Sequence, residues 1–379
     1  MINAQRLAQT FMDLVRIDSV SKEEADVAAE LKQTLEAMGG AGVTDRAGEA
    51  TGSNSGNLIV KFEGTVDRPP LMLNAHMDTV EPGRGIKPTF KEGVFTSDGS
   101  TILGSDDKSA VAIIIETMRV LRENRLPHGP LELVFTVCEE IGLLGAKHLD
   151  FDLISAKMGY ALDASDTDGI VTRAPAANRL DFKVHGKDAH AGAAPEKGIN
   201  AITLASRAIA SLDLGRIDHE TTCNIGTIEG GMATNIVPAL VTVKGEVRSH
   251  DPAKLEEVTN RIVGAFEGAV NQAKGALPGE DLPRLETTVS RDFSHTFIPD
   301  DHPMIELART AASHLGRSIV TKTSGGGADA NVFFEHGIMT GVLGTGMRDM
   351  HSVRESVRLA DMVRSGELLL EIIRLHAEG

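Results

Sequence analysis

The segment LMLNAHMD, residues 71–78, is an apolar run that ends in a histidine and, two residues later, an aspartate. A near-continuous apolar run is typical of a strand covered on both faces in an α/β protein. In open α/β sheets, ligands bind beyond the carboxyl ends of the strands. We therefore expect His76 to present a ring nitrogen to a metal while Asp78 holds the other ring nitrogen. A strand-end histidine beside a turn aspartate is the alternative.

A second segment, LELVFTVCEEIG at residues 131–142, is also an apolar strand that ends in charged residues. Two adjacent acids repel each other unless cations compensate them or one keeps its proton. A metal hydrolase uses both states, since one carboxylate binds the metal and the other takes a proton from water. This pattern indicates that one of Glu139 and Glu140 is a ligand and the other a base, and solvated acids on a surface turn are the alternative.

The segment LGSDDKS, residues 103–109, places two acids after a glycine at the start of a helical pattern. Asp106 and Asp107 could be a helix cap with first-turn charges. In the functional interpretation, one of the two carboxylates bridges two cations. Two further segments end in candidate ligands, YALD at Asp163 and MHSVRE at His351.

These segments together favour a metal centre more than any one of them does. Two histidines and three carboxylates suit two zinc-like ions that share one bridging acid and keep open positions. Two ions roughly 3.5–4 Å apart can activate a water and polarise a carbonyl together.

The composition indicates a globular protein of ordinary type. A length of 379 residues suggests two domains. The net charge of −16 argues against nucleic acid and anionic membrane as partners. No apolar run approaches the roughly 20 residues that span a bilayer, and the N-terminus is predicted to be an amphipathic helix, so we expect a cytoplasmic protein. Cys138 and Cys223 are expected to be reduced and partly buried.

The order of predicted elements indicates an α/β domain interrupted by an α+β insertion. Helix Glu23–Met38, with Ser21 as its cap, precedes strand Asn57–Phe62, and helix Ser109–Glu123 lies between the two apolar strands. After Asp163 the strands alternate apolar and polar residues, which predicts an antiparallel sheet covered on one side. The insertion contains strands Leu180–Val184, Thr221–Ile228 and Val241–Val247, helices Ile199–Leu212 and Pro252–Ala273, and a loop Gly275–Pro283.

The ordered motifs HMD, GSDDK, EEIG, ALD, DAHAGAAPEKGINAI and MHSVRE resemble the co-catalytic zinc exopeptidases, over essentially the whole chain. This family includes peptidase T, carboxypeptidase G, aminoacylase and succinyl-diaminopimelate desuccinylase, and the resemblance is greatest to peptidase T-like proteins. It implies a mixed central sheet flanked by helices, with an inserted α+β sandwich. The catalytic domain would comprise residues 1–175 and 292–379, and the lid or dimerisation domain residues 176–291.

The resemblance also implies residue roles. His76, Asp106 and Asp163 would hold one zinc ion, and Asp106, Glu140 and His351 the other, with cobalt or manganese able to replace zinc. Asp106 is taken as the bridge because the family's bridging aspartate lies two residues before the lysine, here Lys108. Asp78 would orient His76, and Glu139 would be the general base. Relatives with aspartate at the position of Asp163 tend to be peptidases, whereas glutamate tends to mark deacylases.

Three residues of the insertion resemble the family's substrate contacts. His190 would donate to the developing oxyanion, in many relatives from the partner subunit, and Asn235 would contact substrate. Arg248 could clamp a terminal carboxylate as a bidentate partner. A turn histidine and a strand-end salt bridge are the alternatives for His190 and Arg248.

We therefore expect a homodimeric di-zinc aminopeptidase of short peptides, in which the compact insertion and the motif DAHAGAAPEKG leave tripeptide specificity open. An N-acyl amino acid amidohydrolase or a dipeptidase is the alternative enzyme. A metal-dependent peptide-binding protein without turnover is the alternative of another class, and it would need neither Glu139 nor Asp78.

Overall fold

The computed structural model describes residues 1–275 and 281–379 and divides the chain into two compact units. Unit 1 comprises Met1–Arg173, Thr296–Ser324 and Ala328–Gly379, and unit 2 comprises Ala174–His295 and Gly325–Gly327. Strand β13 (Arg284–Phe293) extends unit 2 beyond residue 291 because its pairing with strand β9 (Ala176–His185) continues to Phe293. Most of the predicted loop Gly275–Pro283 lies outside the described residues.

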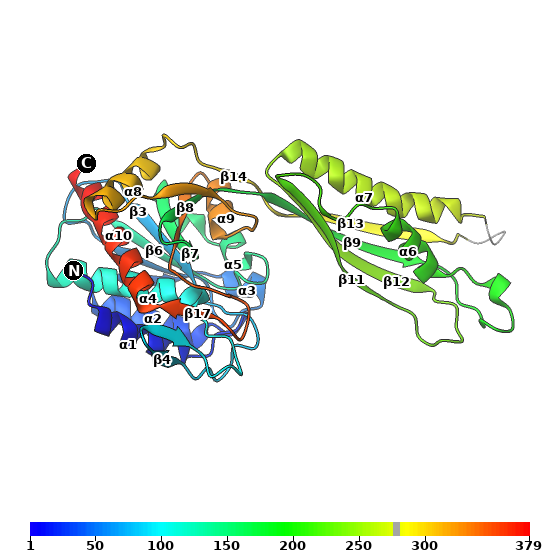
Figure 1. Ribbon diagram of the computed structural model, residues 1–379, viewed down its shortest axis with the longest axis horizontal. Coiled ribbons are helices and arrows are strands. Elements are labelled where there is room, and N and C mark those ends of the chain that lie inside the picture. Colours follow the sequence, from blue (N-terminus) through cyan, green and yellow to red (C-terminus); the bar gives the residue numbers. More distant parts are fainter. Residues whose placement is uncertain (276–280) are drawn as a thin grey trace. The chain divides into compact units, whose positions relative to one another are not determined.

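Unit 1 contains a mixed sheet whose central strands are parallel (Figure 1). Strand β3 (Leu71–His76) pairs in parallel with β6 (Leu131–Thr136) on one side and with β7 (Met158–Ala164) on the other. Strand β16 (Met339–Gly344) continues the parallel set beside β7. The remaining strands are β1 (Ala41–Thr44) and β2 (Leu58–Phe62) beyond β6, and β8 (Gly169–Ala174), β14 (Thr296–Phe297) and β15 (Val320–Thr323) beyond β16.

Helices flank this sheet, which explains why every residue of β3 and β6 is buried. Helix α4 (Ser105–Glu123) packs on β3 and β7 and also against α1 (Ala4–Val15) and α10 (Leu359–Glu378), and α10 contacts α8 (Pro303–His314). Helix α2 (Ala25–Ala37) packs on β1 and β2, and the short helices are α3 (Ala47–Thr51), α5 (Leu144–Lys147) and α9 (Asp329–Glu335). The predicted fold class is thus confirmed, with a mixed central sheet flanked by helices.

Two local predictions in unit 1 are wrong in detail. Helix α2 begins at Ala25, and its cap position is Glu24, which forms no side-chain cap. The predicted cap, Ser21, donates its hydroxyl to Asp78. Helix α4 begins at Ser105 rather than Ser109, and Asp106 and Asp107 have non-helical backbone angles within its first turn. This irregular turn changes the direction in which the two adjacent carboxylates point.

A small antiparallel sheet was not predicted. Strands β4 (Thr89–Lys91) and β5 (Val94–Thr96) form a hairpin, and β17 (Ser356–Arg358) pairs with β5. This pairing ties the chain that follows His351 to a segment some 260 residues earlier.

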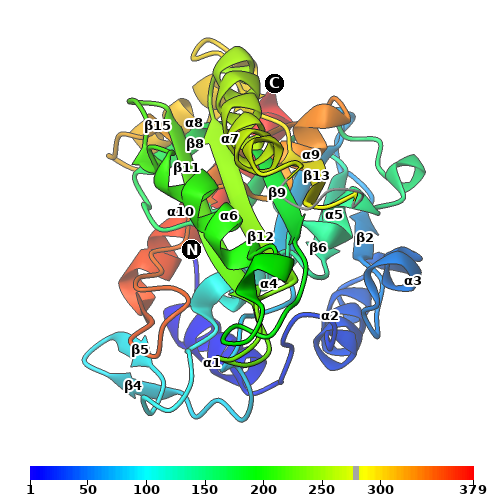
Figure 2. The ribbon, with the colours of Figure 1, turned by 90° about the vertical axis from the view of Figure 1, so that its right-hand side faces the viewer.

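Unit 2 is an α+β sandwich. Its sheet has the order β10-β11-β12-β9-β13, with all four pairings antiparallel. The strands not yet given are β10 (Gly215–Arg216), β11 (Thr221–Gly230) and β12 (Leu240–Ser249). Helices α6 (Ala201–Ala210) and α7 (Pro252–Gln272) pack against each other and on the sheet, which Figure 2 shows from the helix side. Asn200 and Asp251 cap these helices, which begin and end within two residues of their predicted bounds.

Candidate metal centre

Four predicted site residues lie at one edge of the unit 1 sheet. Strands β3, β6 and β7 are parallel neighbours, so their carboxyl ends meet at the same edge. His76 is the last residue of β3, Glu139 and Glu140 follow β6, and Asp163 is the last residue but one of β7. Because the three strands are paired in a fixed register, the main-chain positions of these residues at the sheet edge are fixed as well.

Asp106 lies between two histidines. Its Oδ1 is 3.1 Å from Nε2 of His76, and its Oδ2 is 3.3 Å from Nε2 of His351. His351 Nε2 is also 3.0 Å from the Glu140 carboxylate. Each oxygen of the Asp106 carboxylate thus faces a different imidazole nitrogen, which is the arrangement of a carboxylate that bridges two sites.

Two groups of potential ligand atoms share Asp106. One group is His76, Asp106 and Glu140, and the other is Asp106, Asp107 and Asp163, with ligand atoms in each group within 4.8 Å of one another. The family resemblance implies Asp163 with His76 and Glu140 with His351, whereas these groups place the ligand atoms of Glu140 with His76 and those of Asp163 with Asp107. Asp163 and Glu140 both lie beside Asp106, and the second group adds Asp107, which the sequence analysis set aside.

Asp107 is fully buried beside the same centre. Its Oδ2 accepts a hydrogen bond from the main-chain nitrogen of His76 at 3.2 Å, whereas its Oδ1 has no hydrogen-bond partner among the described residues. Burial raises the pKa of Asp107 well above its usual value. A buried carboxylate oxygen without a partner fits a place where a cation belongs.

The electrostatics of the centre also fit cations. Burial and the charge of Asp106 raise the pKa of Asp163 well above its usual value, and burial raises that of Glu140. Hydrogen bonds to Asp106 and Glu140 raise the pKa of His351 to about 10. Burial acts to raise the pKa of Asp106, but its hydrogen bonds with His351 and His76 hold it below its usual value. The site collects more negative charge than its own side chains neutralise.

Asp78 organises this edge of the sheet. Its side chain is fully buried, and it accepts hydrogen bonds from the main-chain nitrogens of Glu139 at 2.9 Å and Glu140 at 3.3 Å. Ser21 donates to the same carboxylate at 2.6 Å. The Nδ1 of His76 lies 2.9 Å from the Asp78 main-chain oxygen and 3.5 Å from its carboxylate. Asp78 therefore fixes the His76 ring through its carbonyl and the two glutamates through its carboxylate.

Glu139 is adjacent to the ligand cluster but belongs to neither group of ligand atoms. Its pKa is raised well above the usual value, first by burial and further by the charges of Asp163 and Asp329. The preceding residue, Cys138, has a positive φ of 52°, which turns the chain sharply at the end of β6. Burial and these neighbouring charges favour the protonated form of Glu139, as expected of a group that accepts and returns a proton.

Two acidic residues of this region were not predicted to have a role. Glu355 is buried and accepts hydrogen bonds from the loop that carries Asp106. Asp329 begins helix α9, accepts a hydrogen bond from Thr136 at the end of β6, and has a pKa raised to about 6 by burial. Glu355 is the last residue of the motif MHSVRE, but no local sequence pattern indicates the hydrogen-bond partners of either residue.

Unit 2 brings together two of its three predicted site residues. His190 pairs with Ile236 in an isolated bridge, and the main-chain nitrogen of Ala191 donates to the Asn235 carbonyl at 2.9 Å. Both His190 and Asn235 are exposed. The Nδ1 of His190 accepts from the main-chain nitrogens of Gly192 and Ala193, at 3.1 Å each. Since Nδ1 is an acceptor, Nε2 carries the proton of the neutral ring and can donate it.

Arg248 lies near the last residue of strand β12, whereas the loop that carries Asn235 precedes the first residue of that strand. Eight residues of extended strand separate it from Leu240, a distance of about 27 Å at roughly 3.4 Å per residue. Its guanidinium donates to Glu246 at 2.9 Å and to the Gly325 carbonyl at 3.3 Å, and it lies over the Phe293 ring. Arg248 and His190 of one chain therefore cannot both contact one small ligand.

Neither cysteine provides a nucleophile. Cys138 and Cys223 are both free and buried. Burial raises the pKa of Cys138 to about 12, so its thiol stays protonated at neutral pH. Among the described residues, no helix combines the length and apolar character needed to cross a bilayer.

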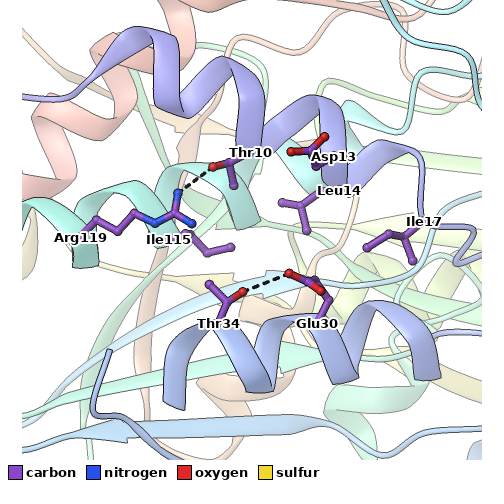
Figure 3. Close-up of a pocket in the computed structure, with 8 residues that line it drawn as sticks. All are labelled: Thr10, Asp13, Leu14, Ile17, Glu30, Thr34, Ile115 and Arg119. Carbon is purple, nitrogen blue, oxygen red and sulfur yellow. Dashed lines mark hydrogen bonds between the residues drawn. The ribbon is translucent and has the colours of Figure 1, made fainter. Parts of the chain in front are cut away.

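A separate hollow lies among helices α1, α2 and α4 (Figure 3). It measures about 230 Å³, and Arg119 donates there to Thr10 at 2.7 Å. None of the predicted site residues lines it. The candidate chemistry of unit 1 is therefore at the sheet edge and not in this hollow.

Comparison with known proteins gives matches along most of the chain. The profile "Peptidase family M28" matches residues 57–170, and the profile "Peptidase dimerisation domain" matches residues 176–273. The uncharacterized protein YqjE of Bacillus subtilis is 41% identical over 374 residues, which cover 98% of this chain and 99% of that protein.

Two crystal structures are similar over the full length of both chains. Aminopeptidase PepT from Bacillus cereus has a TM-score of 0.89 and 40% sequence identity, with 100% of each chain covered. A tripeptidase from Staphylococcus aureus has a TM-score of 0.92 and 38% identity, again with 100% of each chain covered.

Proposed function

We propose that this chain is a di-zinc aminopeptidase of short peptides, including tripeptides. The chain belongs to the peptidase T-like branch of the M20 peptidase superfamily and is a metallopeptidase with exopeptidase activity. The family assignment made from the motifs is thereby confirmed. The observation that carries the proposal is Asp106, whose two carboxylate oxygens face two different histidines. The tripeptidase and aminopeptidase relatives support the substrate class.

The donor set fits two ions. We assign His76, Asp106 and Asp163 to one ion and Asp106, Glu140 and His351 to the other, with Asp107 as a buried carboxylate behind the first. Imidazole nitrogens and carboxylates suit zinc, and cobalt or manganese accept the same donors. When bound, two such ions polarise the scissile carbonyl and lower the pKa of water. The side chain of His351 is 54% exposed, so this side of the centre is open to a substrate.

The side chains then move the proton. Glu139 takes a proton from the attacking water and gives it to the leaving amine nitrogen, a role suited to a carboxyl group whose pKa is raised. Asp78 keeps the Glu139 backbone and the His76 ring in place through its hydrogen bonds. A protein that only bound peptides would need neither arrangement.

Unit 2 provides a lid and a dimer interface in this proposal. His190 donates its Nε2 proton to the oxyanion, Asn235 contacts the substrate beside it, and Arg248 binds a terminal carboxylate. A tripeptide spans only about 11 Å, whereas about 27 Å of strand separates Arg248 from the His190 end of β12. A homodimer resolves this, because His190 and Asn235 can then act on the substrate held by the partner subunit.

The test is hydrolysis by one preparation of tripeptides, dipeptides and N-acyl amino acids, with and without chelator. We expect tripeptides to lose their N-terminal residue fastest. We expect chelation to abolish turnover and Zn²⁺ to restore it. Faster hydrolysis of N-acyl amino acids would contradict the proposed substrate class, and turnover that survives complete removal of metal would contradict the proposed mechanism.

A further inference from the structure

The side chain of Glu355 is 1% exposed and has no basic residue within ion-pair distance among the described residues. Burying a carboxylate is costly unless hydrogen bonds or charges compensate it. Four donors compensate this one, and all four belong to the segment Leu103–Asp106. This concentration of hydrogen bonds on one four-residue segment indicates that Glu355 holds that segment in place.

The four hydrogen bonds divide between the two carboxylate oxygens. Glu355 Oε2 accepts from the main-chain nitrogens of Leu103 and Gly104, at 2.8 Å each. Glu355 Oε1 accepts from the Ser105 hydroxyl at 2.6 Å and from the main-chain nitrogen of Asp106 at 3.0 Å. The last bond ends on the residue whose side chain lies between the two histidines.

The same glutamate is tied to the other side of the centre through its own chain. His351 lies four residues earlier, in a turn with a positive φ of 60°, and the main-chain nitrogen of Glu355 donates to the Ser352 carbonyl at 3.0 Å. Strand β17 begins at the next residue and is paired with β5. Glu355 therefore joins the segment that carries Asp106 to the segment that carries His351.

We propose that Glu355 is a positioning residue that holds the Asp106 carboxylate between the two metal ions, an inference that rests on the proposed two-ion centre. The backbone of Asp106 is non-helical inside the first turn of α4, so the helix alone does not fix it. Without the four bonds this segment can relax toward a regular helix start, which rotates the carboxylate away from one histidine. The carboxylate then no longer faces both ion positions, so we expect one of the two ions, the second to bind, to be held more weakly.

Glu132 offers a matched control. It is also buried, at 3% exposure, and it also accepts from one short segment, Ser155–Ala156, through two main-chain nitrogens and a serine hydroxyl at 2.7 Å. It lies near the start of β6, whereas the site residues follow the end of that strand. Glu132 also forms an ion pair with Lys61 at 3.1 Å. Glu132→Gln thus removes comparable hydrogen bonds, and this ion pair as well, in the same unit without touching the centre.

The experiment titrates metal-free wild type, Glu355→Gln and Glu132→Gln with Co²⁺ and follows the visible absorption of the bound ion. We expect two ions in wild type and in Glu132→Gln. In Glu355→Gln we expect about 10- to 100-fold weaker binding of the second ion, the effect typical of residues that support metal ligands, together with a changed spectrum. Circular dichroism and the melting temperature establish that each variant is folded.

Two results would overturn the inference in distinguishable ways. If wild type binds two ions and folded Glu355→Gln binds both as tightly with the same spectrum, the positioning role is wrong and the proposed function stands. If wild type binds fewer than two, the proposed function fails and this inference fails with it. Should Glu355→Gln not fold, Ser105→Ala, which removes one of the four bonds, replaces it, and unchanged binding would again overturn the role.

Discussion

The metal centre of unit 1 and the loop residues of unit 2 are built in opposite ways. His76, Asp106 and Asp78 are buried and held by neighbouring side chains or main chain, whereas His190 and Asn235 are exposed on two loops that pair with each other. Bond-breaking chemistry needs ligands and a base held in fixed geometry. A residue that approaches the substrate only when a lid closes can remain exposed until then. The two regions should therefore respond differently to substitution.

The largest effect is expected at Glu139. Glu139→Gln keeps the size of the side chain but removes the base, so kcat should fall by about 10²- to 10⁴-fold. Metal content should not change, because Glu139 belongs to neither group of ligand atoms. Steady-state kinetics and metal analysis check this, with Glu132→Gln as the control, and a kcat within a few-fold of wild type would remove Glu139 from the mechanism.

A smaller effect on kcat is expected at His190 in unit 2. Loss of one oxyanion donor typically costs about 10²- to 10³-fold, so His190→Ala should lower kcat by that factor at unchanged metal content. The control variant is His219→Ala, because His219 is an exposed histidine of the same unit whose side chain is 80% accessible. If the partner subunit supplies His190, mixing inactive His190→Ala with inactive Glu139→Gln should restore activity in heterodimers. Mixtures of dimers that exchange subunits yet stay inactive would argue against action across the interface.

Asp78→Asn should have an intermediate effect, of about 10- to 100-fold on metal affinity or kcat. The asparagine amide can accept through one atom only, so one of the bonds from the Glu139 and Glu140 main-chain nitrogens is lost. Zinc titration and kinetics on the same variant separate a loss of binding from a loss of turnover. An unchanged variant would show that the His76 contact to the Asp78 carbonyl is sufficient.

The smallest effect is expected at Arg248, which is already paired with Glu246 and one-third exposed. Exchanging one partly solvated ion pair for another changes affinity by about 1 kcal/mol or less, so Arg248→Lys should raise KM by up to about 5-fold at constant kcat. The increase should disappear with peptides whose carboxyl terminus is amidated. Arg179→Lys, at a similar pair with Asp292, is the control, and an equal rise for amidated peptides would exclude a carboxylate clamp.

The sequence predicted those parts of the centre that depend on local pattern. His76 and Glu140 follow apolar runs, and a buried parallel strand places the residue at its end by register alone. The partners of Ser21 and Glu355 could not be predicted in this way, because their bonds to Asp78 and to the Leu103–Asp106 segment join residues 57 and about 250 positions apart. Likewise the irregular first turn of α4 could not be predicted, since tertiary contacts rather than local propensity hold Asp106 and Asp107 out of helical geometry.

Anomalous X-ray diffraction at the zinc edge, from crystals grown with Zn²⁺, shows whether Asp106 bridges two metal ions. We expect two peaks roughly 3.5–4 Å apart, with one oxygen of Asp106 on each ion, His76 on one and His351 on the other. A single peak, or two peaks of which only one contacts Asp106, would contradict it.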